Sequence, residues 1–260
     1  MYHNEDSPII RESMQIGKAV EGAEAGSRQG ESAGIRANES PAWRAAYDSQ
    51  AQVERRRSAI PRKLRKLGLE GGTTNVRILD LCCGNGETLD ALYGMGFREL
   101  RGADIVIGPD LAADPRFAAC VADAAALPWA SGSFDWILIV HALHHLGPAE
   151  RIRTVLAECH RLLSPGGRLA IVDFPNSPQI RLAFWCFRRK FWLFTPYLRY
   201  FGKLIQEEWC FLKGYLAEWP RVRVLLQAGP FEIETFHQEF FYYFLTLRKP
   251  VPAGGEDKRP

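Results

Sequence analysis

Short apolar runs alternate with amphipathic stretches through the middle of the 260-residue chain. Apolar positions recur at helical spacing in two separate stretches, one that begins at Glu87 and one across residues 150–163. The intervening apolar runs have the length of strands and lie at residues 76–81, 100–104, 117–122, 136–140 and 169–173. Alternation of this kind is typical of a parallel sheet with helices on both faces. We therefore expect an α/β fold built on a doubly wound, mostly parallel sheet.

The C-terminal part of the chain departs from this alternation. An aromatic segment at residues 179–206 precedes a predicted helix at 216–228. Two further strands are predicted at residues 231–236 and 241–247, and the short connection between them favours an antiparallel edge hairpin. The sheet should then have seven strands, of which the last is antiparallel.

Composition divides the chain into a tail and one domain. Residues 1–40 are rich in Glu, Gly, Ser, Ala and Arg and show no sustained periodicity, so we expect a disordered N-terminal tail. Residues 41–260 should form a single domain, with a helical cap at 41–72 and an aromatic lid insertion at 176–214.

The overall composition is that of an ordinary globular protein, with 47% hydrophobic and 24% charged residues. A net charge of +3 without a long basic block does not favour a nucleic-acid partner. The six cysteines form no C-x-x-C pair, which indicates reduced thiols in a cytoplasmic protein. No apolar run reaches the length of a membrane span, and the N-terminus does not resemble a secretory signal.

A glycine turn follows the first predicted strand. Gly84 and Gly86 allow a ligand to approach the backbone closely, and the helix after them offers unpaired N–H groups. A dinucleotide-binding turn has a third glycine where this chain has Leu89, so the turn does not indicate NAD.

Aspartates mark the strand ends at which a ligand of such a sheet binds. Asp80 lies in the first strand, immediately before the glycine turn. Asp104 ends the second strand about 20 residues after the turn, where a carboxylate can accept both ribose hydroxyls. Asp123 ends the third strand. Helix capping is the alternative role for Asp104, and a turn before Pro128 is the alternative for Asp123.

Five motifs in order resemble those of the class I methyltransferases that use S-adenosylmethionine. They are the glycine loop from Leu79 to Gly86, the strand end Gly102-Ala-Asp-Ile, the turn Ala122-Asp-Ala-Ala-Ala-Leu-Pro-Trp, the strand Ser133-Phe-Asp-Trp-Ile and the turn Leu162-Leu-Ser-Pro-Gly-Gly-Arg-Leu. The resemblance covers roughly residues 45–247 and implies a Rossmann-like fold with S-adenosyl-L-methionine as the cofactor.

The resemblance also implies cofactor contacts. Asp80 and the backbone from Cys82 through Gly84 to Gly86 would surround the methionine part, because a carboxylate and peptide groups hold an ammonium group. Asp104 would bind the ribose, and Asp123 with Ala124 the adenine. Ile105 and His141 complete the expected set of cofactor-binding residues.

The double cysteine of the glycine loop resembles the loop of the quinone C-methyltransferases of menaquinone and ubiquinone synthesis. Cys82 stands where many family members have glycine, and we expect it to be a packed thiol rather than a reactive one. The segment from His141 to His145 differs from that branch, which usually has a Gly-Leu-Arg-Asn type sequence there. The resemblance of the double cysteine, with the aromatic segment at 179–206, implies a lipophilic acceptor with a quinol-like ring as first choice. A polar or secondary metabolite, or a non-catalytic cofactor-binding partner protein, stays open.

The candidate catalytic residues are His144, His145 and Tyr47. Histidine is suited to proton removal near neutral pH, although these two could simply shape the loop. We expect no metal, because no carboxylate or cysteine lies at a suitable spacing from the histidines in the sequence.

The segment 181–204 is densely aromatic and basic. Its phenylalanines recur at helical spacing and its cations interrupt any membrane span, which is typical of a peripheral membrane contact or of a lid over an apolar acceptor. An ordinary helix packed on the sheet would have the same pattern. The pattern does not predict an oligomeric state.

Overall fold

The computed structural model describes residues 50–71, 75–189, 202, 205–206 and 208–252. Its centre is one seven-stranded sheet with the order β3-β2-β1-β4-β5-β7-β6. The strands are β1 (Ile78–Leu81), β2 (Leu100–Asp104), β3 (Ala118–Val121), β4 (Phe134–Val140), β5 (Leu163–Asp173), β6 (Glu232–Gln238) and β7 (Tyr243–Arg248). The first five are mutually parallel, and β7 pairs antiparallel with both β5 and β6. The expected fold class, with its antiparallel last strand, is confirmed.

Helices cover both faces of the sheet because alternate residues of each strand point to opposite faces. On one face α7 (Ala149–Leu162) and α10 (Trp209–Ala228) pack on one set of strand side chains, such as Leu79 and Ile137. On the other face α4 (Gln50–Lys66) and α5 (Glu87–Gly94) pack on the other set, such as Ile78 and Leu138. The short helix α6 (Pro109–Ala112) adds Leu111 to this second core.

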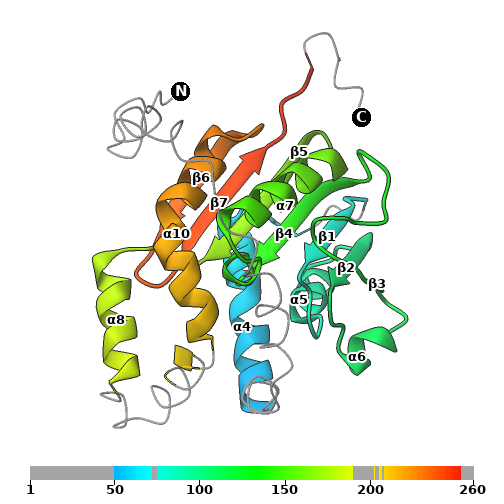
Figure 1. The fold of residues 1–260 in the computed structure, drawn as a ribbon. Helices are drawn as coiled ribbons and strands as arrows, with labels where there is room; N and C mark the ends of the chain where they lie inside the picture. Colours follow the sequence, from blue (N-terminus) through cyan, green and yellow to red (C-terminus); the bar gives the residue numbers. More distant parts are fainter. Residues whose placement is uncertain (1–49, 72–74, 190–201, 203–204, 207, 253–260) are drawn as a thin grey trace.

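A third apolar cluster lies beyond the end of β5. Phe174 and Ile180 belong to it, together with Phe184 and Phe187 of α8 (Pro178–Arg188) and Leu212 of α10. Ser177 caps the start of α8, and its hydroxyl oxygen accepts a hydrogen bond from the amide of Ile180 at 3.2 Å. In Figure 1 α4, α8 and the first turns of α10 lie together on the side toward which the β4 arrow points.

The helix α4 is joined firmly to the sheet. It ends where Gly68 adopts a positive φ of 91°, and the amide of Leu69 then bonds to the carbonyl of Leu64 at 3.1 Å. The hydroxyl of Thr246 on β7 donates to the carbonyl of Leu67 at 3.1 Å. A helix that precedes the five motifs is thereby bonded to β7, the strand next to the edge of the sheet.

Several predicted boundaries are wrong. β1 begins two residues later than predicted, β4 begins at Phe134, and β5 begins at Leu163 rather than at 169 because the Ser-Pro-Gly-Gly stretch continues the strand through an irregular register with β4. α10 begins at Trp209 rather than at 216, so part of the expected lid belongs to that helix. The tail that we expect at 1–40, the cap before residue 50 and the lid residues 190–201, 203–204 and 207 lie outside the described residues.

Candidate active site

The strand order reverses between β1 and β4, and an open α/β sheet binds ligands in the crevice at such a point. The residue after each of these strands has an unusual backbone. Cys82 has φ 63° and His141 has φ 56°, and no other non-glycine residue in the described part of the chain has a positive φ. A left-handed conformation costs an L-residue roughly 1–2 kcal/mol, and such strain accumulates at functional sites. We call the ends of β1, β2 and β3 the glycine-loop edge, and the ends of β4 and β5 with the short helix η1 (Leu143–His145) the histidine edge.

The glycine loop is held by the neighbouring strand. The amide of Cys82 bonds to the carbonyl of Ala103 at 2.7 Å, and the amide of Gly84 donates to Oδ2 of Asp104 at 2.8 Å. Gly84 and Gly86 have positive φ values of 50° and 84°. A Cβ built on Gly84 would meet no atom within 4 Å, so the space above the loop is open for a ligand.

Carboxylates surround this loop. Asp80 is 2% exposed, and its Oδ2 has no hydrogen-bond partner. Burial, and then the negative charges of Asp104 and Glu87, raise the pKa of Asp80 well above its usual range. Burial also raises the pKa of Asp104, although its hydrogen bonds from Val106 and Gly84 oppose that rise. Mutually repelling carboxylates around an open loop fit a positively charged ligand.

Asp123 is placed more openly, just after β3. Its Oδ1 accepts hydrogen bonds from the amide of Ala125 at 2.8 Å and from Arg151 at 2.9 Å, and these lower its pKa against a smaller effect of burial. The side chain is 48% exposed and keeps acceptor capacity on its carboxylate. Ala124 beside it is buried, whereas Ile105 after β2 is 37% exposed.

The two loop cysteines are packed thiols. Burial, with the charges of Asp104 and Asp80, raises the pKa of Cys82 well above its usual range, and burial raises that of Cys83 as well. A thiol with a raised pKa is a poor nucleophile at neutral pH. The position after β1 therefore has a conformational role, which explains why glycine would suit it.

At the histidine edge, His144 is bound by acidic partners. Its Nδ1 lies 2.8 Å from Oδ1 of Asp173, and its backbone amide donates to Oδ2 of the same residue at 3.1 Å. Its Nε2 faces Oε2 of Glu208 at 3.8 Å. Burial alone would lower the pKa of His144, but Asp173 and Glu208 together raise it to about 10.

The other two histidines are in contrasting surroundings. Burial, followed by the charge of His144, lowers the pKa of His145 well below its usual range, and its ring packs on Phe211 with centroids 4.8 Å apart. His141 Nε2 lies 2.5 Å from Nζ of Lys63 on α4, and burial followed by that cation lowers the pKa of His141. Burial in turn lowers the pKa of Lys63 to about 8.

A cleft of about 480 Å³ opens beside Lys63. Its residues come from α4 and from the β6–β7 hairpin and are Ser58, Ala59, Arg62, Lys63, Lys66, Glu239, Tyr242 and Phe244. Lys66 pairs with Glu239 across it. The cleft gives solvent access to the ring of Tyr242, which lies 4.5 Å from that of His141 between centroids.

The sequence-predicted residues therefore fall into two groups. Asp80, Cys82, Gly84, Gly86 and Asp104 meet in one loop, while His141, His144 and His145 meet at the next strand ends. Tyr47 lies outside the described residues.

Sequence reasoning missed three contributors, Lys63, Asp173 and Glu208. Asp173 could have been found, since it ends β5 at the carboxyl edge of the sheet. The expectation that no carboxylate completes a histidine cluster is corrected, because Glu208 lies with His144 and His145 although it is about 60 residues away in the chain.

Known proteins are similar to this chain in sequence and in fold. A family model described as a methyltransferase domain matches residues 79–171. An uncharacterized methyltransferase of Synechocystis sp. is 31% identical over 183 residues, which cover 69% of this chain and 71% of that protein. The chain belongs to the class I S-adenosylmethionine-dependent methyltransferases. Its methyl donor is S-adenosylmethionine.

Among the methyltransferase's other relatives is the demethylmenaquinone methyltransferase of Thermus thermophilus, 36% identical over 112 residues. That match covers 40% of this chain and 49% of the relative, so the chain spans about half the length of that protein.

Solved structures share the fold. The 1,6-didemethyltoxoflavin-N1-methyltransferase of Burkholderia thailandensis has a TM-score of 0.54 at 18% identity, over 88% of this chain and 92% of that one. The magnesium protoporphyrin IX methyltransferase of Synechocystis has a TM-score of 0.52 at 17% identity, over 86% of this chain and 100% of that one.

Proposed function

We propose that the methyltransferase binds S-adenosylmethionine at the glycine-loop edge through Asp80, Asp104 and Asp123. The raised pKa values of Asp80 and Asp104 support this, because a sulfonium and an ammonium group would neutralise their repulsion. Each oxygen of Asp104 already accepts one amide and retains a lone pair for a ribose hydroxyl. Asp123 retains acceptor capacity for the adenine amino group.

The acceptor that we propose is a lipophilic small molecule with a quinol-like ring. The observation that carries this proposal is the cluster of aromatic side chains at the histidine edge, of which Tyr242 lines the cleft. Phe174 lies 5.4 Å from His144 and 5.4 Å from Tyr242 between ring centroids, and Phe211 lies against His145. Aromatic side chains of this kind beside a cleft suit a flat, apolar ring. The similarity to quinone C-methyltransferases points in the same direction.

The chain's own contribution to catalysis would be alignment and exclusion of water. The bound cofactor supplies a methyl group that is already activated on sulfur. The buried Phe174 and the packed third cluster would keep the acceptor dry and in line, which can account for most of the acceleration of such a transfer.

The acceptor proposal is tested with purified enzyme, S-adenosylmethionine and two substrate pools. One pool is a reduced prenylated naphthoquinone without the ring methyl group, and the other is a polar metabolite extract. We expect S-adenosylhomocysteine and a methylated quinone, detected by mass spectrometry, and no product with the Asp104→Ala variant. Methylation confined to the polar pool would contradict the acceptor proposal while leaving the enzyme class intact.

A polar, anionic acceptor is the second candidate, because one observation favours it. Arg62, Lys63 and Lys66 line the cleft beside His141, and Glu239 is the acidic residue among its lining. Substitution of Arg62 by Ala should raise the KM for an anionic acceptor and leave the KM for a quinol unchanged. The same two substrate pools measure this difference.

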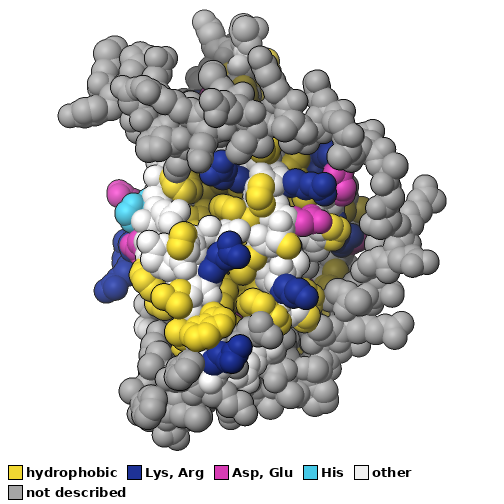
Figure 2. Space-filling view, turned by 60° about the vertical axis from the view of Figure 1, so that its left-hand side comes forward, with side chains coloured by type: hydrophobic (Ala, Val, Ile, Leu, Met, Phe, Trp, Pro, Cys, Tyr) yellow, Lys and Arg dark blue, Asp and Glu magenta, His cyan; other side chains and the backbone are white. Residues whose placement is uncertain are grey.

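We also propose that α8 contacts a membrane surface peripherally. None of the described helices is long and apolar enough to cross a membrane. On the outer face of α8, Leu182 is 61% and Trp185 49% exposed, and Arg181 and Arg189 are exposed beside them. The face of the molecule drawn in Figure 2 carries Lys and Arg among hydrophobic side chains. Such a surface favours anionic lipid headgroups.

Co-sedimentation with vesicles tests this contact. Wild-type protein should bind vesicles rich in phosphatidylserine, more weakly in high salt, and the double variant Leu182→Ser, Trp185→Ser should lose binding. Equal binding of that variant would contradict the α8 contact.

A further inference from the structure

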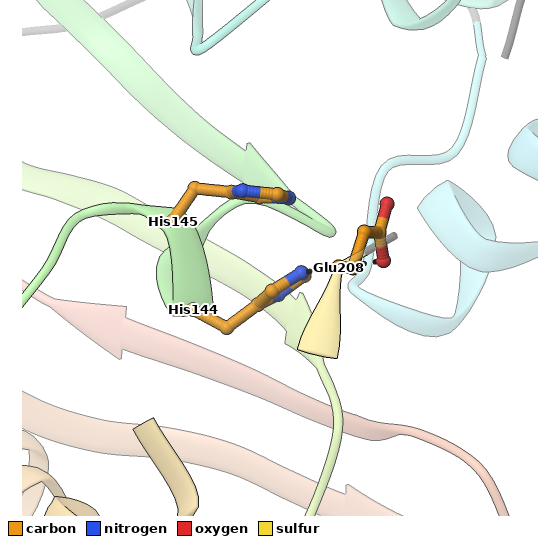
Figure 3. A group of neighbouring side chains, drawn as sticks. All are labelled: His144, His145 and Glu208. Atoms are coloured by element: carbon orange, nitrogen blue, oxygen red, sulfur yellow. Dashed lines mark ion pairs between the residues drawn. The ribbon is translucent and has the colours of Figure 1, made fainter. Parts of the chain in front are cut away.

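A group of three metal-binding side chains lies at the histidine edge, outside the roles proposed above for the cofactor and the acceptor. His144 and His145 extend from η1, and Glu208, the residue immediately before α10, lies beside them (Figure 3). We propose that His144, His145 and Glu208 form a binding site for a divalent transition-metal ion of the zinc type. The site goes beyond the proposed function, since it requires no particular acceptor.

The geometry is close to that of a metal site. One ligand atom from each residue lies within 4.8 Å of the others, and Nε2 of His144 lies 3.8 Å from Oε2 of Glu208. A tetrahedral zinc ion with bonds of about 2.0–2.1 Å separates its ligand atoms by roughly 3.3 Å. An inward shift of about an ångström, within the reach of side-chain rotation, would bring the three atoms to that separation.

The partners of His144 orient it as a ligand. Its Nδ1 is engaged by Oδ1 of Asp173 at 2.8 Å, while the amide of Phe174 donates to the same oxygen at 2.7 Å. Asp173 and His144 are both fully buried. A carboxylate that accepts a hydrogen bond from Nδ1–H fixes the tautomer in which Nε2 is free to bind a metal. Metal-ligating histidines usually have such a partner.

Two ring nitrogens have no hydrogen-bond partner. They are Nε2 of His144 and Nδ1 of His145, and both are buried atoms. A buried polar atom without a partner is costly, and its presence indicates that something else satisfies it. A metal ion held by one ring nitrogen of each histidine would satisfy Nε2 of His144 together with the carboxylate of Glu208, which is itself 6% exposed.

Protonation of His144 is the competing explanation. An imidazolium between Asp173 and Glu208 would account for the 3.8 Å approach, but it would leave Nδ1 of His145 without a partner. It would also place a positive charge against a neighbouring imidazole whose ring centroid is 4.1 Å away. The metal site accounts for both histidines at once.

The chemistry of the site follows from its ligands. Two imidazoles and one carboxylate suit Zn²⁺, Co²⁺ or Fe²⁺ rather than Mg²⁺ or Ca²⁺. Three protein ligands leave at least one coordination position for water or for another oxygen ligand. The site lies among Phe174 and Phe211 at the histidine edge, so such a ligand would meet an apolar environment.

Titration of the chelator-treated full chain, without an affinity tag, with Co²⁺ tests the proposal. Wild-type protein should bind one equivalent, show visible d–d absorption, and release the ion on addition of Zn²⁺. Glu208→Gln and His145→Ala should each bind at least about tenfold more weakly. Circular dichroism confirms that each variant is folded, and Glu208→Ala replaces Glu208→Gln if that variant is not.

The matched control is His237→Ala. His237 forms an exposed pair with Glu239 at 3.5 Å and belongs to no three-residue group among the described residues, so this variant should bind Co²⁺ like wild type. The proposal is overturned if the wild-type protein binds no stoichiometric Co²⁺ or Zn²⁺, or if a folded Glu208 or His145 variant retains wild-type affinity.

Discussion

The glycine-loop edge and the histidine edge lie side by side at the same end of the sheet, but they are assembled differently. The glycine-loop edge comes from consecutive strand ends between residues 80 and 124. The histidine edge takes its side chains from β4, β5, α4, α10 and the β6–β7 hairpin. A site built from consecutive segments can be read from motifs, whereas a site built from distant segments depends on the fold.

The two edges also differ in electrostatics. At the glycine-loop edge the carboxylate of Asp80 is buried and that of Asp104 is half-buried, and no cationic side chain contributes to the shifts of their pKa values. At the histidine edge Asp173 holds His144, and Lys63 lies against His141. The first edge is destabilised until a cation binds, whereas the Asp173–His144 pair of the second contributes to the stability of the protein without a ligand.

The largest expected effect is on folding stability at the histidine edge. Asp173→Ala removes the partner of a buried histidine and of the amide of Phe174, which should lower the free energy of unfolding by about 3–5 kcal/mol. Urea denaturation followed by circular dichroism measures this loss. A loss no greater than that caused by Asp104→Asn would contradict the difference between the two edges.

The backbone strain after β1 predicts a smaller effect. Cys82→Val places a β-branched residue at φ 63° and should cost about 1–2 kcal/mol of stability, whereas Cys82→Gly should be neutral or slightly stabilising. Thermal unfolding of the two variants distinguishes an effect of backbone conformation from an effect of the lost thiol. Loss of stability in the glycine variant would mean that the side chain of Cys82, and not its backbone, is what matters.

Removal of a charge at the glycine-loop edge should raise the free energy of unfolding rather than lower it. The pKa of Asp80 is raised in the folded protein, so its ionised form disfavours folding at neutral pH. Asp80→Asn should therefore increase the free energy of unfolding by up to roughly 1 kcal/mol and weaken S-adenosylmethionine binding. Such a trade-off between stability and function is common at functional sites. Denaturation and titration calorimetry on one preparation would test both; a destabilised variant would contradict the electrostatic difference.

The last expected effect is on the pH dependence of cofactor affinity. A cationic ligand favours ionised Asp80 and Asp104, so affinity should rise with pH through their raised pKa values and fall as pH decreases through them. Each linked proton changes affinity by at most about tenfold per pH unit. Titrations between acidic and neutral pH should show this slope, with a shallower one for S-adenosylhomocysteine, which lacks the sulfonium charge. Equal slopes for the two ligands would show that the sulfonium charge does not cause the pH dependence.

Much of the fold could be predicted because its elements are local. The apolar run at Leu100–Asp104 was predicted with its exact ends, and α5 begins at Glu87 because Gly86 with φ 84° allows the turn before it. β5 was predicted too short because a Pro-Gly-Gly stretch is normally a turn, whereas here it continues the strand. The short α6 has too few residues to show periodicity.

The site was predictable to the same extent. Asp80 and Asp104 follow from a spacing that one supersecondary unit fixes. Glu208 has no pattern linking it to His144, because only the packing of α10 against η1 brings them together. Lys63 likewise reaches His141 through the position of α4, so its contact could not be inferred from the sequence around either residue.

Calorimetric titration of S-adenosylmethionine into wild-type protein and into the Asp104→Asn variant is the most direct test of the cofactor site at the glycine-loop edge. We expect one site in the wild-type protein and at least a 100-fold loss of affinity, roughly 2.7 kcal/mol, in the variant, with unfolding free energies that differ little. Unchanged affinity in the folded variant would contradict the assignment of the glycine-loop edge as the cofactor site.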